Sequence, residues 1–158
     1  MVYYSHDTER RVILLQNRDY KFFNYAKHIA RISDFDRCPI GCVVVYKGQV
    51  IGTGFNCHKT HPLQKLYNKY RFPEDDKPHK IHAEIHAISP LLKQDIDWHK
   101  VVLYIYRRRK DGMLGLARPC EGCMAFIKKL GIRDIYYTTD DGFCYENIVS
   151  DRKESIDV

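Results

Sequence analysis

The strongest constraint on the fold is a pair of β-rich stretches, Ile40–Tyr46 and Gln49–Phe55. Only Lys47 and Gly48 separate them, so the two stretches predict a tight β-hairpin. Before this hairpin, apolar residues spaced along Tyr20–Ile32 fit one face of a helix. The first third of the chain is therefore predicted to be a helix followed by two antiparallel strands.

The next part of the chain combines a polar region with two regular elements. The region from Asn56 to Lys80 is long for a plain loop, and its PLQKLYNKYRF segment predicts a short helix. A helix that begins near His82 is expected to end at Pro90 or shortly after it. The unbroken apolar segment VVLYIY, from Val101, predicts a buried strand.

The last part of the chain predicts a helix and two strands. RPCEGCMAFIKKLG carries one apolar helical face and ends on Gly131, a favourable C-cap. DIYYTT and FCYENI predict strands, and Asp141–Gly142 between them predicts a hairpin turn that makes the last strand antiparallel to its neighbour. Together these elements predict one domain over residues 1–158, a three-layer α/β/α sandwich with a mixed five-stranded sheet.

Composition excludes several classes of protein. With 44% hydrophobic and 29% charged residues, the 158-residue chain has the composition of a globular protein. Its longest apolar segments are strand-sized, so no membrane span is expected, and the N-terminal segment lacks the features of a signal peptide. We therefore expect a cytoplasmic protein whose six cysteines are thiols or metal ligands. The net charge of +6 suits an anionic partner, such as a nucleotide or nucleic acid, and also plain solubility.

Two short motifs stand at the starts of predicted helices. His82, Glu84 and His86 occupy an otherwise apolar segment; taken alone, they also fit a solvated first turn or a core histidine with a polar partner. Cys120 and Cys123 share one face of a first turn and, taken alone, fit a pair of buried structural thiols. Taken together, His82 and the two cysteines supply three metal ligands and leave the fourth tetrahedral position of a catalytic zinc to water.

The combination of His82–Ala83–Glu84 with Pro119–Cys120 and Cys123 resembles the signature of zinc-dependent nucleobase deaminases. From about residue 40 to residue 137, the chain is similar to the cytidine deaminase superfamily. This resemblance implies a sandwich with one Zn²⁺ per chain between the two motif helices. It also implies that His82, Cys120 and Cys123 are the metal ligands and that Glu84 is the proton shuttle.

The chemistry expected of such a site is a hydrolysis. Zinc lowers the pKa of water, towards about 7 in favourable cases, and Glu84 would carry the proton from water to the ring nitrogen of the base. Backbone N–H groups at the helix start, including that of Ala83, would hold a carbonyl oxygen of the substrate. We expect His86 to pack or hydrogen-bond behind the site.

The substrate contacts are less constrained. Superfamily members commonly place an Asn at the end of the second strand, where it touches sugar or base, and Asn56 matches that position; it also fits an Asn that simply ends a strand. Cys57, His58 and His61 fit a phosphate contact, part of a second metal site or a solvated loop. The Arg107–Lys110 segment fits either a polynucleotide track or a solvated loop.

The terminal hairpin and the HAE motif point to different branches of the superfamily. The terminal hairpin resembles the free cytidine deaminases, whereas the HAE motif is usual in the deoxycytidylate, tRNA and polynucleotide-editing branches. Arg118 also departs from the tRNA adenosine deaminases, in which this position is commonly Glu. We expect hydrolytic deamination of a cytosine-type base in a free nucleoside or nucleotide, and the active form is open between a monomer and a homo-oligomer. The alternatives are a single-stranded DNA or RNA editing deaminase and a non-catalytic, zinc-stabilised binding module.

Overall fold

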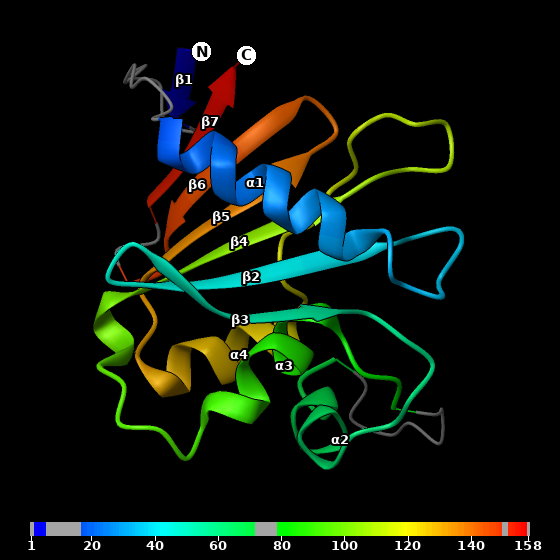
Figure 1. Ribbon diagram of the computed structural model, residues 1–158, viewed down its shortest axis with the longest axis vertical. Helices are drawn as coiled ribbons and strands as arrows, with labels where there is room; N and C mark the ends of the chain where they lie inside the picture. The colour runs from blue at the N-terminus through cyan, green and yellow to red at the C-terminus, as the bar shows by residue number, and fades with distance from the viewer. Residues whose placement is uncertain (1, 6–16, 72–78, 150–151, 158) are drawn as a thin grey trace.

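A mixed β-sheet forms the centre of the molecule (Figure 1). The computed structural model describes residues 2–5, 17–71, 79–149 and 152–157. Over these residues the sheet has seven strands in the spatial order β1-β7-β6-β5-β4-β2-β3. The strands are β1 (Val2–Ser5), β2 (Ile40–Tyr46), β3 (Gln49–Phe55), β4 (Val101–Arg107), β5 (Asp134–Thr139), β6 (Gly142–Asn147) and β7 (Arg152–Asp157).

The predicted hairpin is formed by β2 and β3, which pair antiparallel. Lys47 (φ 52°) and Gly48 (φ 76°) both adopt left-handed backbone conformations. Two successive positive φ angles are typical of the type I′ turn, whose twist matches that of the strands it joins. Gly48 adopts such an angle without steric cost, which explains why this pair of residues fixes the hairpin.

The predicted five-stranded mixed sheet is confirmed as β3-β2-β4-β5-β6, and the structure extends it by two further strands. β4 and β5 are parallel, whereas β5 and β6 form the antiparallel hairpin predicted from Asp141–Gly142. β7 and β1 continue the sheet beyond β6. The β7 sequence, RKESID, has no apolar alternation, so nothing in its pattern indicated a strand.

Helices cover both faces of the sheet and complete the three predicted layers (Figure 1). α1 (Asn17–Ala30) crosses one face, and α2 (Pro62–Asn68), α3 (Ala83–Ile88) and α4 (Glu121–Leu130) lie on the other. α1 ends before the predicted Ile32, whose side chain is exposed. α4 ends as predicted at Gly131, with a φ of 101°. None of the helices among the described residues is long and apolar enough to cross a membrane.

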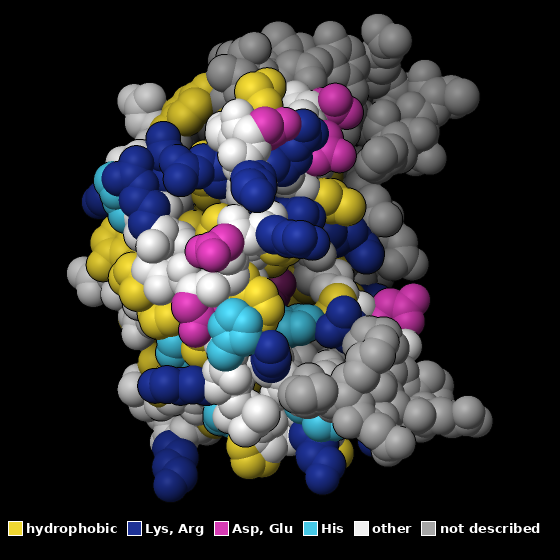
Figure 2. Space-filling view, turned by 90° about the vertical axis from the view of Figure 1, so that its right-hand side faces the viewer, with side chains coloured by type: hydrophobic (Ala, Val, Ile, Leu, Met, Phe, Trp, Pro, Cys, Tyr) yellow, Lys and Arg dark blue, Asp and Glu magenta, His cyan; other side chains and the backbone are white. Residues whose placement is uncertain are grey.

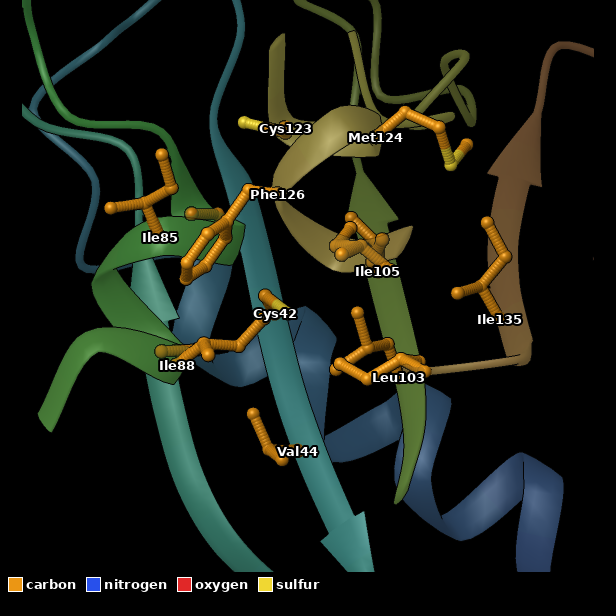
Figure 3. Packing of buried hydrophobic residues seen from close by; sticks show 14 of the residues in the cluster. Cys42, Val44, Ile85, Ile88, Leu103, Ile105, Cys123, Met124, Phe126 and Ile135 are labelled. Carbon is orange, nitrogen blue, oxygen red and sulfur yellow. The ribbon is translucent and has the colours of Figure 1, made fainter. Parts of the chain in front are cut away.

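The sheet separates two hydrophobic clusters. On the α1 face, Phe22, Phe23 and Ala26 pack against the tyrosines of β4, and the Phe23 and Tyr104 ring centroids are 5.3 Å apart. The larger cluster fills the space between the sheet and helices α3 and α4 (Figure 3). Its members include Cys42, Val44, Ile85, Ile88, Leu103, Ile105, Cys123, Met124, Phe126 and Ile135.

α3 lies directly on β3 because Gly54 has no side chain. A Cβ on Gly54 would lie 2.3 Å from the backbone nitrogen of Ala87 and 2.7 Å from the carbonyl oxygen of Ala83. No other residue type fits beneath this helix without moving it, since real Cβ atoms do not approach backbone atoms so closely. The contact fixes the start of α3, and with it His82 and Glu84, relative to the sheet.

Candidate metal centre and active site

His82 stands directly before α3 and brings its ring to the start of α4. Its backbone is extended (φ −86°, ψ 159°) and ends the segment that precedes the helix. Its Nδ1 atom lies 3.5 Å from Sγ of Cys120 and 3.4 Å from Sγ of Cys123. Three side chains from separate parts of the sequence therefore converge because α3 and α4 lie side by side (Figure 3).

The two cysteines belong to the first turn of α4. Cys120 is the N-cap, and its Sγ accepts the backbone N–H of Cys123 at 3.4 Å. The ligand atoms of His82, Cys120 and Cys123 all lie within 4.8 Å of one another. Tetrahedral zinc, with bonds of about 2.3 Å to sulfur and about 2.0–2.1 Å to nitrogen, places its ligand atoms roughly 3.5 Å apart. The spacing and the chemistry of this donor set both fit one zinc ion.

The two thiols have pKa values shifted in opposite directions. The pKa of Cys120 is lowered to about 4, because Cys123 hydrogen-bonds its thiolate and His82 adds a second hydrogen bond. The same hydrogen bond, together with complete burial, raises the pKa of Cys123. Metal binding requires deprotonated thiols, so a cysteine whose pKa is already lowered favours the binding of a divalent metal.

Glu84 lies beside this group on the first turn of α3. Only 4% of Glu84 is exposed, and burial raises the pKa of its carboxyl group, although the nearby charge of His82 acts in the opposite direction. The Cys123 thiol partly offsets this rise in the pKa of Glu84. A buried carboxyl group with a raised pKa, next to a metal-binding group, can both accept and donate a proton.

The other residues of α3 have backbone or structural roles. The Ala83 backbone is buried between His82 and Glu84, in the first turn, where N–H groups have no partner within the helix. The His86 ring lies behind the site, where its Nδ1 is 2.8 Å from the carbonyl oxygen of Phe55 and 3.1 Å from the backbone nitrogen of that residue. His86 therefore has the packing position expected from the sequence.

Asn56 is buried at the end of β3, where its side chain joins two loops. Its Oδ1 accepts hydrogen bonds from the Ser33 hydroxyl at 2.6 Å and from the backbone N–H of Ile40 at 2.9 Å. Its Nδ2 donates to the carbonyl oxygen of Cys38 at 2.7 Å. These contacts use both acceptor sites of Oδ1 and one of the two N–H donors, so one donor of the amide remains for a ligand.

α2 contributes a polar wall that the sequence analysis did not identify. Gln64 is completely buried, and its Oε1 accepts the backbone N–H of His82 at 2.9 Å. Asn68, one turn later, accepts a hydrogen bond from Nε2 of Gln64 at 2.8 Å. Farther on, Nη1 of Arg71 lies 3.0 Å from Nε2 of His82.

A sequence signal for this wall existed. Gln64 and Asn68 are four residues apart, which places them on one face of α2, and Arg71 follows in the turn beyond the helix. Leu66 is exposed, whereas Tyr67 is buried with the two amides. The inner face of α2 therefore combines Tyr67, which packs in the core, with two buried amides that face the residues around His82.

The remaining histidines and cysteine of the 57–61 segment have separate partners. His61 caps α2 by accepting the backbone N–H of Leu63, and His58 pairs with Asp34 at 2.9 Å. Cys57 is buried in the core. Among the residues that the structure describes, His82, Cys120 and Cys123 form the one group placed to hold a metal, so the second metal site considered from the sequence is not formed there.

The basic residues around the site are partly engaged. Nε and Nη2 of Arg118 both lie 2.9 Å from the carboxylate oxygens of Glu146, which is almost fully buried. Arg107 donates to the carbonyl oxygen of Leu116, and Arg109 forms an ion pair with Asp111. The ion pair between Arg118 and Glu146, with two hydrogen bonds, connects the segment before Pro119 to β6. This connection helps to position the turn that carries Cys120.

Comparisons with known proteins give one family and one fold. A family model, described as the cytidine and deoxycytidylate deaminase zinc-binding region, matches residues 16–139. Over 142 residues the chain is 28% identical to the tRNA-specific adenosine deaminase subunit tad2 of Schizosaccharomyces pombe, covering 86% of this chain and 30% of that protein. The chain thus spans less than a third of the length of this relative.

Solved structures share the fold at low sequence identity. The dCMP deaminase of cyanophage S-TIM5, in complex with dCMP and dUMP, has a TM-score of 0.57 and 18% identity, covering 80% of this chain and 85% of that one. A cytidine deaminase from Burkholderia pseudomallei has a TM-score of 0.52 and 14% identity, covering 90% and 93%. At such identities the likeness extends to the fold alone.

Proposed function

Because the chain belongs to the cytidine and deoxycytidylate deaminase zinc-binding family, we propose that it catalyses the zinc-dependent hydrolytic deamination of a nucleobase. The observation that carries this proposal is the buried Glu84 carboxyl group next to three converging metal ligands. A purely structural zinc site has no need of a carboxyl group at that position. A cytosine-type base is the first candidate substrate.

His82, Cys120 and Cys123 would hold one zinc ion per chain. Their ligand atoms have the spacing that tetrahedral zinc requires, and three protein ligands leave one position open. The bound metal would act as a Lewis acid that makes water acidic enough to react near neutral pH. Gln64 would keep the His82 backbone in place from behind by accepting its N–H.

Glu84 would move the protons of the reaction. Hydrolysis forms a bond from the water oxygen to the ring carbon that carries the amino group, and it breaks the bond from that carbon to nitrogen. Glu84 would take a proton from water, deliver it to the ring nitrogen, and help to protonate the amino group as it leaves as ammonia. Burial supports this role, because a raised pKa makes the carboxylate a stronger base, which helps it to take the proton from water and hold it until transfer.

Asn56 and Ala83 are the proposed substrate contacts. The remaining N–H donor of the Asn56 amide is suited to a sugar or base oxygen, and the backbone N–H of Ala83 is suited to the base carbonyl. The first candidate carrier of the base is a free nucleoside or nucleotide. The antiparallel β5–β6 hairpin supports it, because this feature resembles the free cytidine deaminases.

A base within a nucleic acid is the second candidate. The likeness to a tRNA-specific adenosine deaminase subunit favours it, as does the net charge of +6. Because this relative is named as an adenosine deaminase subunit, adenine is a second candidate for the reacting base, beside cytosine.

We also propose that residues 1–158 form one domain, since β1 and β7 join one sheet with the strands between them. A single cooperative unfolding transition is the expected result.

The decisive experiment follows ammonia release. Zinc-loaded protein is incubated with cytosine and adenine nucleosides, their monophosphates, and short single-stranded oligonucleotides that contain one reactive base. Ammonia and the deaminated base should appear in equal amounts with at least one substrate, and Glu84→Gln should abolish the signal. Ammonia release from none of these substrates by zinc-loaded protein would contradict the proposed function.

A further inference from the structure

Two aromatic rings are stacked at the edge of the site. The Phe35 and His58 ring centroids are 4.2 Å apart, and the ring planes are inclined by only 10°. Phe35 lies in the loop after α1, whereas His58 lies just beyond β3, so the stack joins two segments (Figure 1). The Phe35–His58 stack takes no part in the proton steps or metal binding described above.

The His58 ring is held in one orientation. Its Nδ1 lies 2.9 Å from Oδ1 of Asp34, and the same oxygen accepts the backbone N–H of His58 at 3.1 Å. The ammonium group of Lys80 lies 5.6 Å from the centroid of the Phe35 ring. Despite these contacts, 49% of the His58 side chain is exposed. A fixed ring with an accessible face is a ready platform for another flat ring.

The stack is close to the proposed reaction centre. The backbone N–H of Cys57 donates to the carbonyl oxygen of Ile81, and the N–H of Ile81 donates to that of Lys59, at 3.2 and 2.8 Å. His58 thus lies in a segment that runs beside the residue preceding His82. Asn56, a proposed substrate contact, precedes His58 by two residues, so the stack follows the proposed substrate contact directly along the chain.

In the segments that carry the stack, the basic residues Lys59, Lys80 and Arg37 outnumber the acidic residues Asp34 and Asp36. Lys59 is exposed and Lys80 is half-buried, and both belong to the two paired segments beside His82. Arg37 is exposed in the loop that carries Phe35. Figure 2 shows one side of the molecule, on which several Lys and Arg side chains and some Asp and Glu side chains lie near the histidines at its centre. Such a surface suits phosphate groups on either side of a stacked base.

We propose that the exposed face of His58 stacks on the base next to the reacting one in a single-stranded nucleic acid. The proposal rests on the proposed deaminase function and selects its second candidate carrier. A free nucleoside has one base, which the Glu84 site would occupy, whereas an aromatic platform beside that site requires a second base. Stacking tolerates any base sequence because every base presents a flat π face.

The test compares substrates with and without the neighbouring base. Reactive bases are supplied as free nucleosides and within RNA and DNA oligonucleotides, either intact or with an abasic nucleotide on the 5′ or the 3′ side of the reactive one. His58→Ala should lower kcat/KM for the intact oligonucleotide, relative to the free nucleoside, by about tenfold. His58→Tyr, which restores a stacking ring, should recover most of the loss. His28→Ala, an exposed histidine on α1, is the matched control.

A double-mutant cycle gives the sharpest result. In the wild-type protein, one of the two abasic oligonucleotides should show the same loss of about tenfold, and His58→Ala should add no further loss with it. The RNA and DNA arms identify which nucleic acid is used. Equal effects of His58→Ala on oligonucleotide and nucleoside, or an additive effect with both abasic oligonucleotides, would overturn the proposal.

Binding separates this proposal from the proposed function. Zinc-loaded Glu84→Gln protein is titrated with the same labelled oligonucleotides, and fluorescence anisotropy should show the same dependence on His58 and on the neighbouring base. If no substrate releases ammonia but this dependence remains, the deaminase proposal fails and the stacking subsite stands. If ammonia is released but affinity is the same with and without each neighbouring base, the deaminase proposal stands and the subsite is wrong.

Discussion

At the scale of single residues, the side chain that decides between enzyme and binding module is Glu84. Glu84→Gln keeps the size of the side chain and a hydrogen-bonding group near Cys123, but it cannot take a proton from water. We expect zinc content and thermal stability to stay close to the wild-type values while kcat falls by at least about 10²-fold. Metal analysis and steady-state kinetics on the same preparation check this, and near-normal turnover would contradict the assigned role.

The cysteines give the second prediction at this scale. Cys120→Ala and Cys123→Ala each leave two of the three proposed ligands, too few for a stable zinc site. Both variants should lose most of the one zinc ion per chain, as measured by atomic emission on dialysed protein. Cys38→Ala, a thiol outside the group, is the control and should keep its zinc. Full zinc content in both ligand variants would show that other residues bind the metal.

At the scale of elements, α2 supports the site through a buried amide. Gln64→Leu fits a side chain of similar size but leaves the backbone N–H of His82 and the side chain of Asn68 without their partner. The cost should be about 1–3 kcal/mol in the free energy of unfolding, and zinc affinity should fall about tenfold or more. Urea titration and competition with a chelator measure the two effects. Lys65→Leu, an exposed neighbour, should change neither.

The contact between α3 and β3 gives another prediction at this scale. In Gly54→Ala, the added methyl group would overlap backbone atoms of Ala83 and Ala87, which cannot rotate away. The helix must shift, so we expect a loss of about 1–3 kcal/mol in stability and weaker zinc binding, because His82 moves with the helix. Thr53→Ala, on the opposite face of β3, tests whether any substitution in this strand has that effect. Unchanged zinc affinity in Gly54→Ala would show that the close approach does not position the metal group.

At the scale of the whole molecule, the net charge of +6 predicts how nucleic-acid binding responds to salt. If Lys59 contacts one phosphate of a single strand, Lys59→Ala should reduce the slope of log affinity against log salt by about 0.7. The loss should be similar for all oligonucleotide sequences, because phosphates carry no sequence information. Lys93→Ala, exposed beyond the far end of α3, should leave the slope unchanged. Equal slopes for wild type and Lys59→Ala would remove Lys59 from the contact.

The sequence by itself determined the order of the main elements from α1 to β6 and the residue types of the site. Strand and helix periods are local properties, so Ile40–Tyr46 and Gln49–Phe55 could be predicted with their correct bounds. The Gly48 and Gly142 turns identified two hairpins for the same reason. His82, Cys120 and Cys123 could be identified as possible ligands from residue type and spacing, before their distances were known.

The tertiary structure alone decided which distant residues meet. β1 and β7 form by backbone pairing at an edge of the sheet, which needs no apolar pattern, so local sequence could not indicate them. Gln64 appeared to be an ordinary polar residue, because only the packing of α2 beside His82 buries its amide against the His82 backbone. Likewise, the stack of Phe35 on His58 joins segments from two loops. Such contacts depend on how the elements pack in three dimensions, and periodicity along the chain contains no information about that packing.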